Sequence, residues 1–308
     1  RIPPPSVVHI SRYGGNGYPD HYPFRSDFGS DNEFRAFLRE ARERGLLVCP
    51  YTNPTWWMDS SPTLAREGMA GVGIGLDGKP LRESWPEGGG WATTPWHPLT
   101  RRYNGQMLDL FTKTFPVDLL FQDQVGARGF RYDFNPSAPS PLAYCEGLLS
   151  AAEEDARAVP LATEQGWDQV ANVEALCANY SFAYLPSVGG DTAPLYKNHL
   201  RPDMWESEPI VLRMMHGKTL FMAHNLSKGC WTPRELAWLL PHGFKLNWSF
   251  WKEYADHCPY SFEWLEFLTR LQQAFTASVF EQPLVRYRHD RSVVSDEGRD
   301  LVNPYDDG

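Results

Sequence analysis

The sequence lacks several features that would assign it to other classes of protein. None of its apolar runs is long enough to span a bilayer, so we expect no transmembrane helix. It has no H-x-H or H-E-x-x-H motif and its nine His are dispersed, so it predicts no metal site and no cofactor. A formal net charge of -9 argues against nucleic acid or an anionic membrane as a partner. A neutral or cationic ligand fits this charge better.

Cysteine is scarce and scattered. The five cysteines form no C-x-x-C pair that would indicate zinc or a redox site, and we expect them to be small buried hydrophobic residues: Cys49, Cys145, Cys177, Cys230 and Cys258. The chain begins at Arg1 with neither an initiator Met nor a signal-peptide pattern. The sequence therefore predicts no particular compartment.

Strand-like and helix-like segments alternate along the chain without internal repeats, which is typical of βα units around a parallel sheet. The expected strands are 6–11, 46–51, 91–96, 117–121, 159–163, 180–185, 219–224 and 243–250. Eight such units predict an α/β fold, a TIM barrel, over residues 1–282. Residues 283–308 change to short strands with turn residues. We interpret them as the start of a truncated C-terminal β domain, with further β domains in a longer chain.

Helix signals separate these strands. A capping box of Ser30 and Glu33 opens the clearest helix, and Gly45 ends it. Further helices are expected at 101–115, after Ser140 and Pro141, at 207–217, after the capping box at 232–235, and from about 261. The third strand has a second candidate, 72–76, which we interpret instead as a hairpin within a long loop.

A TIM barrel carries its active site at the carboxyl ends of the strands. Polar or aromatic residues occupy these predicted ends, with polar neighbours beside several of them: Tyr13, Asn53, His97, Asp123, Glu164, His224 and Trp248, and the neighbours Gln124, Gln165, Asn225 and Asn247. They outnumber what strand termination requires, which favours a functional site.

Asp123 and Glu164 are the strongest catalytic candidates. They are one βα unit apart, so they belong to adjacent strands and face each other across the barrel mouth. Glycoside hydrolysis needs two opposed carboxyl groups, roughly 5–5.5 Å apart for retention and roughly 6.5–9.5 Å for inversion. Adjacent strands slightly favour the shorter separation. Asp133 or Asp191 could replace one of the pair. The alternative for the pair itself is a structural role, in which Asp123 ends a strand and Glu164 pairs with an Arg.

Aromatic side chains make up 14% of the sequence, and many lie in Pro- and Gly-rich loops where flat apolar faces can stack on sugar rings. Core packing is the alternative for each of them, and an N-cap pair is the alternative for His224 and Asn225. Trp91 lies near the same strand ends as Trp56, Trp57 and Trp96. With the polar strand ends, the expected substrate contacts are Tyr51, Asn53, Trp56, Trp57, Trp96, His97, Gln124, Asp133, His224, Asn225 and Trp248.

The segments "LLFQDQVG…YDFN" and "LATEQGWD", with "YTNPTWW" upstream and "FMAHNL" downstream, resemble an uncharacterised family of bacterial glycoside hydrolase-like TIM barrels. More distantly, they are similar to the endo-α-N-acetylgalactosaminidases. The resemblance covers roughly residues 7–280. It implies a strand-four nucleophile, Asp123, a strand-five acid/base, Glu164, and retaining hydrolysis of an α-linked sugar.

We therefore expect a glycosidase with a carbohydrate substrate, in which Glu164 has a raised pKa while Asp123 stays ionised. One alternative is an inverting or transferring enzyme that uses the same pair. The other, from a different class, is a carbohydrate-binding barrel without turnover. The sequence does not specify the sugar, the linkage, endo or exo action, or the oligomeric state.

Overall fold

The computed structural model describes residues 2, 4–166, 168–179, 210–223, 236, 239–240, 242–250, 260–275 and 282. The chain divides into two compact units. The first comprises residues 4–164 with 173–175, and the second comprises 1–3, 165–172 and 176–308.

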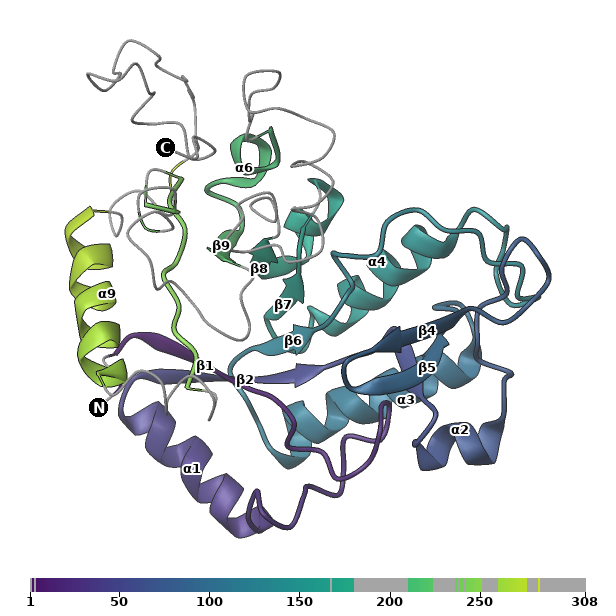
Figure 1. The fold of residues 1–308 in the computed structure, drawn as a ribbon, viewed down its shortest axis with the longest axis horizontal. Helices are drawn as coiled ribbons and strands as arrows, with labels where there is room; N and C mark the ends of the chain where they lie inside the picture. The colour runs from purple at the N-terminus through teal and green to yellow at the C-terminus, as the bar shows by residue number, and fades with distance from the viewer. Residues whose placement is uncertain are drawn as a thin grey trace. The chain divides into compact units, whose positions relative to one another are not determined.

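The first unit is built on a parallel sheet. Its strands are β1 (Ser6–Ile10), β2 (Leu46–Thr52), β6 (Leu120–Gln122) and β7 (Leu161–Glu164). β1 pairs with β2, β2 with β6, and β6 with β7, all in parallel. Figure 1 shows helices α1 (Asp31–Glu43) and α3 (Pro98–Asp109) along one side of these strands. A parallel sheet alternating with helices confirms the α/β class for this unit.

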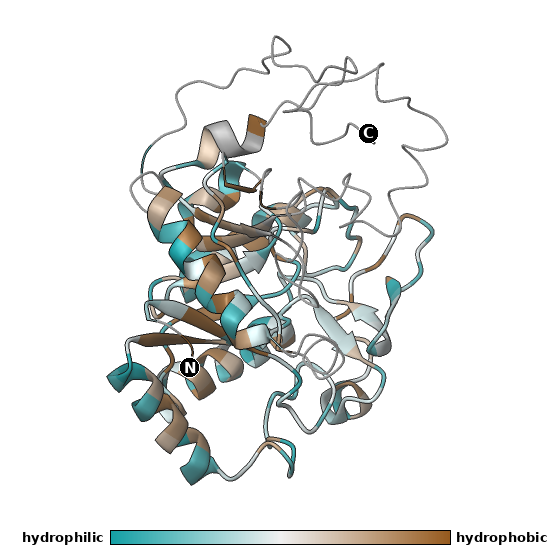
Figure 2. Cartoon of the chain, turned by 60° about the vertical axis from the view of Figure 1, so that its left-hand side comes forward, coloured by the Kyte–Doolittle hydropathy of each residue, from teal (hydrophilic) through white to brown (hydrophobic). Residues whose placement is uncertain are grey.

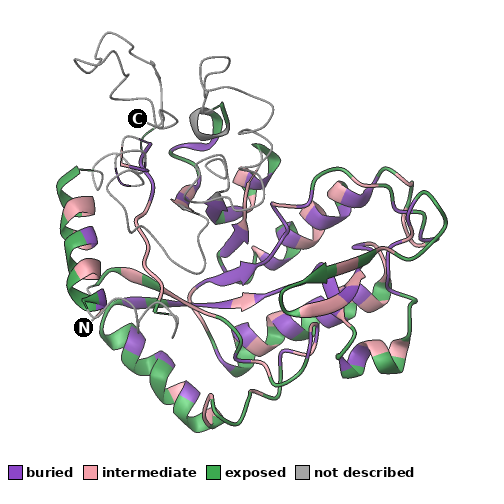
Figure 3. Ribbon diagram, in the orientation of Figure 1, coloured by how far each residue is buried: buried purple, intermediate pink, exposed green. Residues whose placement is uncertain are grey.

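Helix α1 follows its sequence signals closely. The Ser30 side chain accepts from the backbone N–H of Glu33, and the Glu33 carboxylate accepts from the backbone N–H of Ser30. Phe34, Leu38 and Ala41 are buried on one face of the helix. The capping box and the apolar spacing are therefore confirmed, and Figure 3 shows the outer face of this helix as exposed.

The third strand was predicted wrongly. Residues 88–92 form β5 (Gly88–Ala92), which lies between β3 (Trp56–Met58) and β4 (Arg82–Trp85) in a small antiparallel sheet. β2 pairs with β6 directly. Gly90 explains the pairing, because a Cβ at this position would lie 2.5 Å from the Trp56 ring and only glycine lets the strand approach it.

The segment at 72–80 is the hairpin that the sequence predicts. Ile74 bridges Pro80 in the antiparallel sense, and Gly78 has a φ of 73° at the turn. A short helix, α2 (Pro62–Glu67), lies between the small sheet's first strand and this hairpin in the chain. The first unit thus inserts a small sheet, a helix and a hairpin between β2 and α3.

Two helix starts differ from their predictions. Helix α3 begins at Pro98 rather than 101, because the His97 side chain accepts from the backbone N–H of Leu99 as N-cap, and a π-helix (Leu110–Thr114) continues it. Helix α4 (Tyr144–Asp155) begins three residues after Pro141. The Ser140 hydroxyl accepts from the Leu142 N–H and closes a turn before the helix instead of capping it.

The second unit contains most of β8 (Glu174–Asn179) and all of β9 (Leu220–Ala223), which pair in parallel. The helices in its described residues include a 3-10 turn (Asp168–Asn172), α6 (Ile210–Met215) and α9 (Ser261–Phe275). Strand six was expected at 180–185, but β8 ends before it, and residues 180–185 lie outside the described part. Lys245 in the expected strand eight makes a parallel bridge to Met222.

Within the described residues, the structure shows parallel strands with helices but not eight complete βα units. The expected β domain at 283–308 lies outside the described part. Figure 2 shows the apolar character of β1 and β2, whose flanking helices carry polar residues on their other faces. In the described ranges, no helix combines the length and apolar character needed to cross a membrane.

Candidate active site

Asp123 and Glu164 occupy equivalent places on neighbouring strands. Gln122 of β6 is in register with Thr163 of β7, so the next residue on each strand is one of the two acids. Glu164 ends β7, and Asp123 directly follows β6. Since parallel strands end at the same edge of a sheet, both carboxyl groups belong to the carboxyl edge.

Two donors from the adjacent strand hold the Asp123 carboxylate. The Tyr51 hydroxyl donates to Oδ2 over 2.6 Å, and Asn53 Nδ2 donates to the same oxygen over 3.1 Å. Tyr51 lies within β2, and Asn53 is the first residue after it. Both bonds fall on Oδ2, so Oδ1 is the oxygen left for a reacting atom.

Burial and charge act together on Asp123, which is only 7% exposed. Desolvation and the charge of Glu164 raise its pKa to about 8, while the Tyr51 hydrogen bond and the Arg128 charge oppose the rise. We expected the raised pKa on Glu164 and an ionised Asp123. The structure disagrees with the ionised Asp123, because desolvation and the charge of Glu164 both favour its neutral carboxyl.

Left-handed backbone marks the ends of three strands. Among the described residues, the non-glycine residues with positive φ are Arg12 (57°), Gln124 (65°) and Gln165 (56°). They lie just beyond β1, β6 and β7, and the two glutamines directly follow Asp123 and Glu164. Such conformations cost about 1–3 kcal/mol each and concentrate at functional sites. This clustering supports a functional role for the carboxyl edge.

Gln124 and Asn53 have internal partners. Gln124 Oε1 accepts from Arg128 and from the Thr55 hydroxyl, and Asn53 Oδ1 accepts from the backbone N–H of Thr55. Both residues are nearly fully buried. Their side chains are thus engaged inside the protein, and Asn53 holds the Asp123 carboxylate, whereas we expected both residues to contact substrate.

Most of the expected aromatic contacts are structural. Trp56 and Trp57 are 1% and 0% exposed and belong to the core. The Trp96 indole donates to the Ala143 carbonyl over 2.7 Å, just before α4. The Trp91 indole donates to Asp59 over 3.0 Å, and His97 caps α3. Among these four indoles, Trp91 and Trp96 keep partly exposed rings.

Asp133 anchors a loop. It is 0% exposed, and Oδ1 accepts from the backbone N–H groups of Ile74 and Asn135. A fully buried carboxylate that already accepts two backbone hydrogen bonds cannot contact a sugar in this conformation. The structure therefore disagrees with a substrate-binding role for Asp133 and with its candidacy as the catalytic acid.

Several residues that surround Asp123 carry no sequence signal. The charges of Glu87 and of Arg128, which lies in the loop after β6, act on the pKa of Asp123. The charge of Asp123 acts in turn on the pKa of Tyr18. Tyr18 comes from the loop after β1, with its ring 5.7 Å from that of Tyr51. Nothing in their spacing along the chain could have identified them.

Other predicted residues lie elsewhere. His224, Asn225 and Asp191 lie outside the described residues, and Trp248 belongs to the second unit. Tyr13 is 3% exposed and its hydroxyl donates to the Tyr51 carbonyl over 2.5 Å, which steadies the end of β2. Cys49 and Cys177 are buried, as expected. Within the described ranges, no group of three or more His, Cys, Asp or Glu side chains is arranged to hold a metal ion.

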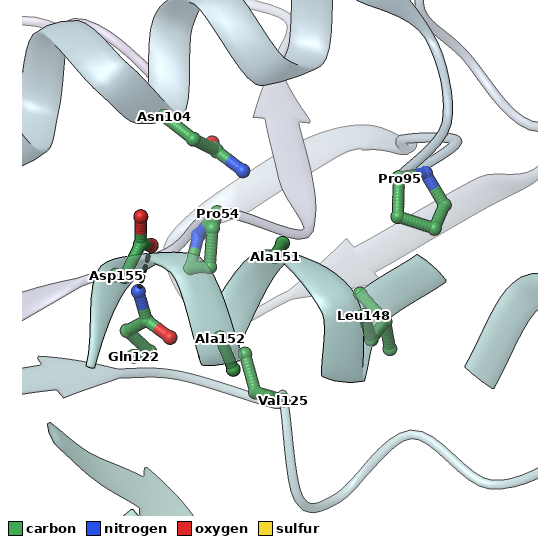
Figure 4. A pocket seen from close by; sticks show the side chains of 9 residues that line it. All are labelled: Pro54, Pro95, Asn104, Gln122, Val125, Leu148, Ala151, Ala152 and Asp155. Atoms are coloured by element: carbon green, nitrogen blue, oxygen red, sulfur yellow. Dashed lines mark hydrogen bonds between the residues drawn. The ribbon is translucent and has the colours of Figure 1, made fainter. Parts of the chain in front are cut away.

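A small cavity lies beside β6, between this strand and helices α3 and α4. It is lined by Pro54, Pro95, Asn104, Gln122, Val125, Leu148, Ala151, Ala152 and Asp155, and it has room for about one water molecule. Figure 4 shows Gln122 hydrogen-bonded to Asp155 at its edge, with an Nε2–Oδ2 distance of 2.6 Å. Successive strand residues point to opposite faces, so this cavity and Asp123 lie on different faces of β6.

Comparisons with known proteins found solved structures with a similar fold. The Gal-NHAc-DNJ complex of the α-N-acetylgalactosaminidase NagBb from Bifidobacterium bifidum matches with a TM-score of 0.66 and 15% identity over 92% of this chain. TtGalA, an α-galactosidase from Thermus thermophilus, matches with a TM-score of 0.53 and 14% identity over 88% of this chain. The chain spans 44% and 55% of their lengths.

At this low sequence identity, these likenesses show a shared fold and not a shared activity. No protein-family model matches the sequence. No curated protein matches it either.

Proposed function

We propose that the chain carries the catalytic centre of a retaining glycoside hydrolase that acts on an α-linked sugar, with Asp123 as nucleophile and Glu164 as acid/base. The observation that carries the proposal is the register of β6 and β7, which makes these acids neighbours at the carboxyl edge. Neighbouring strands are about 4.7–4.9 Å apart, which is closer to the retaining separation of roughly 5–5.5 Å than to the inverting one.

The geometry suits a two-step reaction. Asp123 Oδ1 attacks the anomeric carbon while the glycosidic C–O bond breaks and Glu164 gives its proton to the leaving oxygen. In the second step Glu164 takes a proton from water, the water oxygen bonds to the anomeric carbon, and the bond to Asp123 breaks. Tyr51 and Asn53 hold Oδ2 throughout and keep the carboxylate oriented.

Asp123 holds a proton at neutral pH in the resting site, because desolvation and the charge of Glu164 raise its pKa to about 8. Turnover requires that this proton be on Glu164. Positive charge that develops at the anomeric carbon beside Asp123 favours this distribution.

The fold likeness supports the substrate class. The matched structures are named for α-N-acetylgalactosamine and α-galactose linkages, which agrees with the α-linked sugar that the sequence resemblance implies. A barrel over 1–282, followed by β domains from 283 in a longer chain, remains a prediction. The sugar itself is left to experiment.

A panel of aryl α- and β-glycosides tests the proposal, with Asp123→Asn and Glu164→Gln as variants. We expect hydrolysis of at least one α-glycoside and loss of about 10³-fold or more in each variant. The first product anomer, followed by NMR, separates retention from inversion. Cleavage that persists in both variants would refute the assignment, and sugar binding without cleavage would favour a binding barrel.

A further inference from the structure

A buried ion pair connects the small antiparallel sheet to the loop that follows Asp123. Glu83 lies on β4, and Arg128 lies in the loop after β6. Arg128 NH1 is 2.6 Å from Glu83 Oε1, and NH2 is 2.8 Å from Oε2, which makes the pair bidentate. The two side chains are 5% and 12% exposed. A fork-to-fork pair shielded from water fixes the Arg128 guanidinium in one orientation.

The same guanidinium also holds Gln124. Arg128 NH2 donates to Gln124 Oε1 over 2.5 Å. The Arg128 backbone N–H donates to the Gln124 carbonyl over 2.9 Å and closes a turn. Gln124 is the residue after Asp123 and has a φ of 65°, a conformation that a residue with a side chain adopts only when its surroundings impose it. Arg128 therefore supplies a contact that keeps this backbone in place.

Polar contacts lead from Gln124 back to the Asp123 carboxylate. The Thr55 hydroxyl lies 3.2 Å from Gln124 Oε1 and 2.9 Å from Asn53 Oδ1, and these two acceptors share its single hydrogen. Asn53 Nδ2 donates to Asp123 Oδ2 over 3.1 Å. A movement of Arg128 would thus reach Asp123 by two routes, through the backbone at Gln124 and through its hydrogen-bonded side chain.

Charge adds a third route. The groups that act on the Asp123 carboxyl are Glu164 on β7, Tyr51 on β2, Glu87 between β4 and β5, and Arg128. The charge of Asp123 in turn acts on Tyr18, which follows β1. Glu164 and Glu87 favour the neutral carboxyl, whereas Arg128 and the Tyr51 hydroxyl favour the carboxylate. Arg128 is the cation in this set.

We propose that Arg128, held by Glu83, is a positioning residue for Asp123: it fixes the left-handed Gln124 beside the carboxylate and keeps a buried positive charge near it. The inference rests on the proposed function, because Asp123 is the nucleophile there. Arg128 acts through Gln124 and through its charge, without contact with the substrate.

The test compares Arg128→Gln and Arg128→Lys with Arg131→Gln as the matched control. Arg131 also pairs with Glu83, at 2.9 Å, but its side chain is 28% exposed and it is Arg128 that donates to Gln124. In Arg128→Gln, we expect kcat/KM to fall about 10²-fold and the acidic limb of its pH profile to move up by about one pH unit. Arg128→Lys should restore the limb through its charge but not the full rate. Arg131→Gln should leave the limb unchanged.

A second measurement does not depend on activity. The free energy of unfolding is measured against pH in the wild type, Asp123→Asn, Arg128→Gln and the double variant. Asp123→Asn should remove one part of the pH dependence of the unfolding free energy. That part should shift to higher pH when Arg128 is replaced. This result would support the positioning role even if no glycoside is cleaved, so the two proposals can fail separately. An unmoved limb and an unshifted titration in folded Arg128→Gln would overturn the inference.

Discussion

The hydroxyl of Tyr51 lies 2.6 Å from Oδ2 of Asp123, across the pairing of β2 with β6. The same ring stacks on Phe121 at a centroid distance of 5.7 Å. One residue therefore combines a packing role with a polar contact to the candidate nucleophile. Removing only the hydroxyl separates the two roles.

Tyr51→Phe should lower kcat/KM by about 10- to 100-fold and leave the fold intact, because the ring contacts remain. The Tyr51 hydrogen bond lowers the pKa of Asp123, so its loss should also move the acidic limb of the pH profile to higher pH. The control is Tyr103→Phe, which removes a hydroxyl that is likewise 2.6 Å from a carboxylate, that of Glu67. An unchanged pH profile in Tyr51→Phe would contradict the prediction.

Asp123 should make the protein less stable as the pH rises. Its pKa is raised to about 8 in the folded chain, whereas an unfolded Asp titrates at about 3.9. The folded state therefore binds more protons between these values, and the stabilising contribution, complete below about pH 4, is lost as pH rises through about 8.

Asp123→Asn removes this dependence. Its Tm should exceed that of the wild type by about 2 °C or more at pH 9, and the difference should shrink towards pH 5. Asp155 has its pKa raised to about 6 and contributes a slope of the same sign, but only up to that pH. Asp59→Asn is the control: its pairing with Arg82 lowers the pKa of Asp59, so the contribution of Asp59 changes only below about pH 4 and the Tm difference from the wild type should be the same at about pH 5 and about pH 9. A wild-type Tm that does not fall relative to Asp123→Asn above pH 6 would refute the prediction.

The main strands and the placement of the two candidate acids follow from local sequence. The apolar runs before Asp123 and Glu164 specify buried strands, and the helix between them is long enough for a parallel crossover. Strand pairing then makes the two acids neighbours. This placement needs only the alternation of elements, which is why the sequence predicts it.

The small sheet could not be predicted in the same way. Residues 91–96 have the composition of a strand, but their partner is chosen by the fit of Gly90 against Trp56, a contact between distant segments. In the same packing arrangement, Trp56 and Trp57 are buried in the core, while Tyr51 and Asn53 face Asp123. Side-chain direction beyond a strand end depends on tertiary packing. The Glu83–Arg128 ion pair also depends on tertiary packing, so no periodic pattern in the sequence predicts it.

Asp133 should matter for stability and not for the acid/base steps. Asp133→Ala leaves the N–H groups of Ile74 and Asn135 without their acceptor and should cost about 2–4 kcal/mol of unfolding free energy. Asp133→Asn keeps an acceptor oxygen and should cost less. Urea unfolding gives the free energies, and the kcat/KM profile of folded Asp133→Asn should keep both pH limbs. Loss of one limb would restore Asp133 as the catalytic acid.

The hydrogen bond between Gln122 and Asp155 should matter for the stability of the fold and not for catalysis. Gln122→Leu removes the donor 2.6 Å from a buried carboxyl and leaves Asn104 and Asp155 as the polar residues that line the cavity. Its bond lowers the pKa of Asp155 against desolvation, so the variant should raise that pKa above about 6. The loss of unfolding free energy, about 1–3 kcal/mol, should therefore be larger at pH 8 than at pH 5. Gln122→Glu is the comparison variant, because a second acid beside Asp155 should increase the loss at pH 8 further. Equal losses for Gln122→Leu at the two pH values, measured by urea unfolding, would show that Asp155 does not depend on this donor.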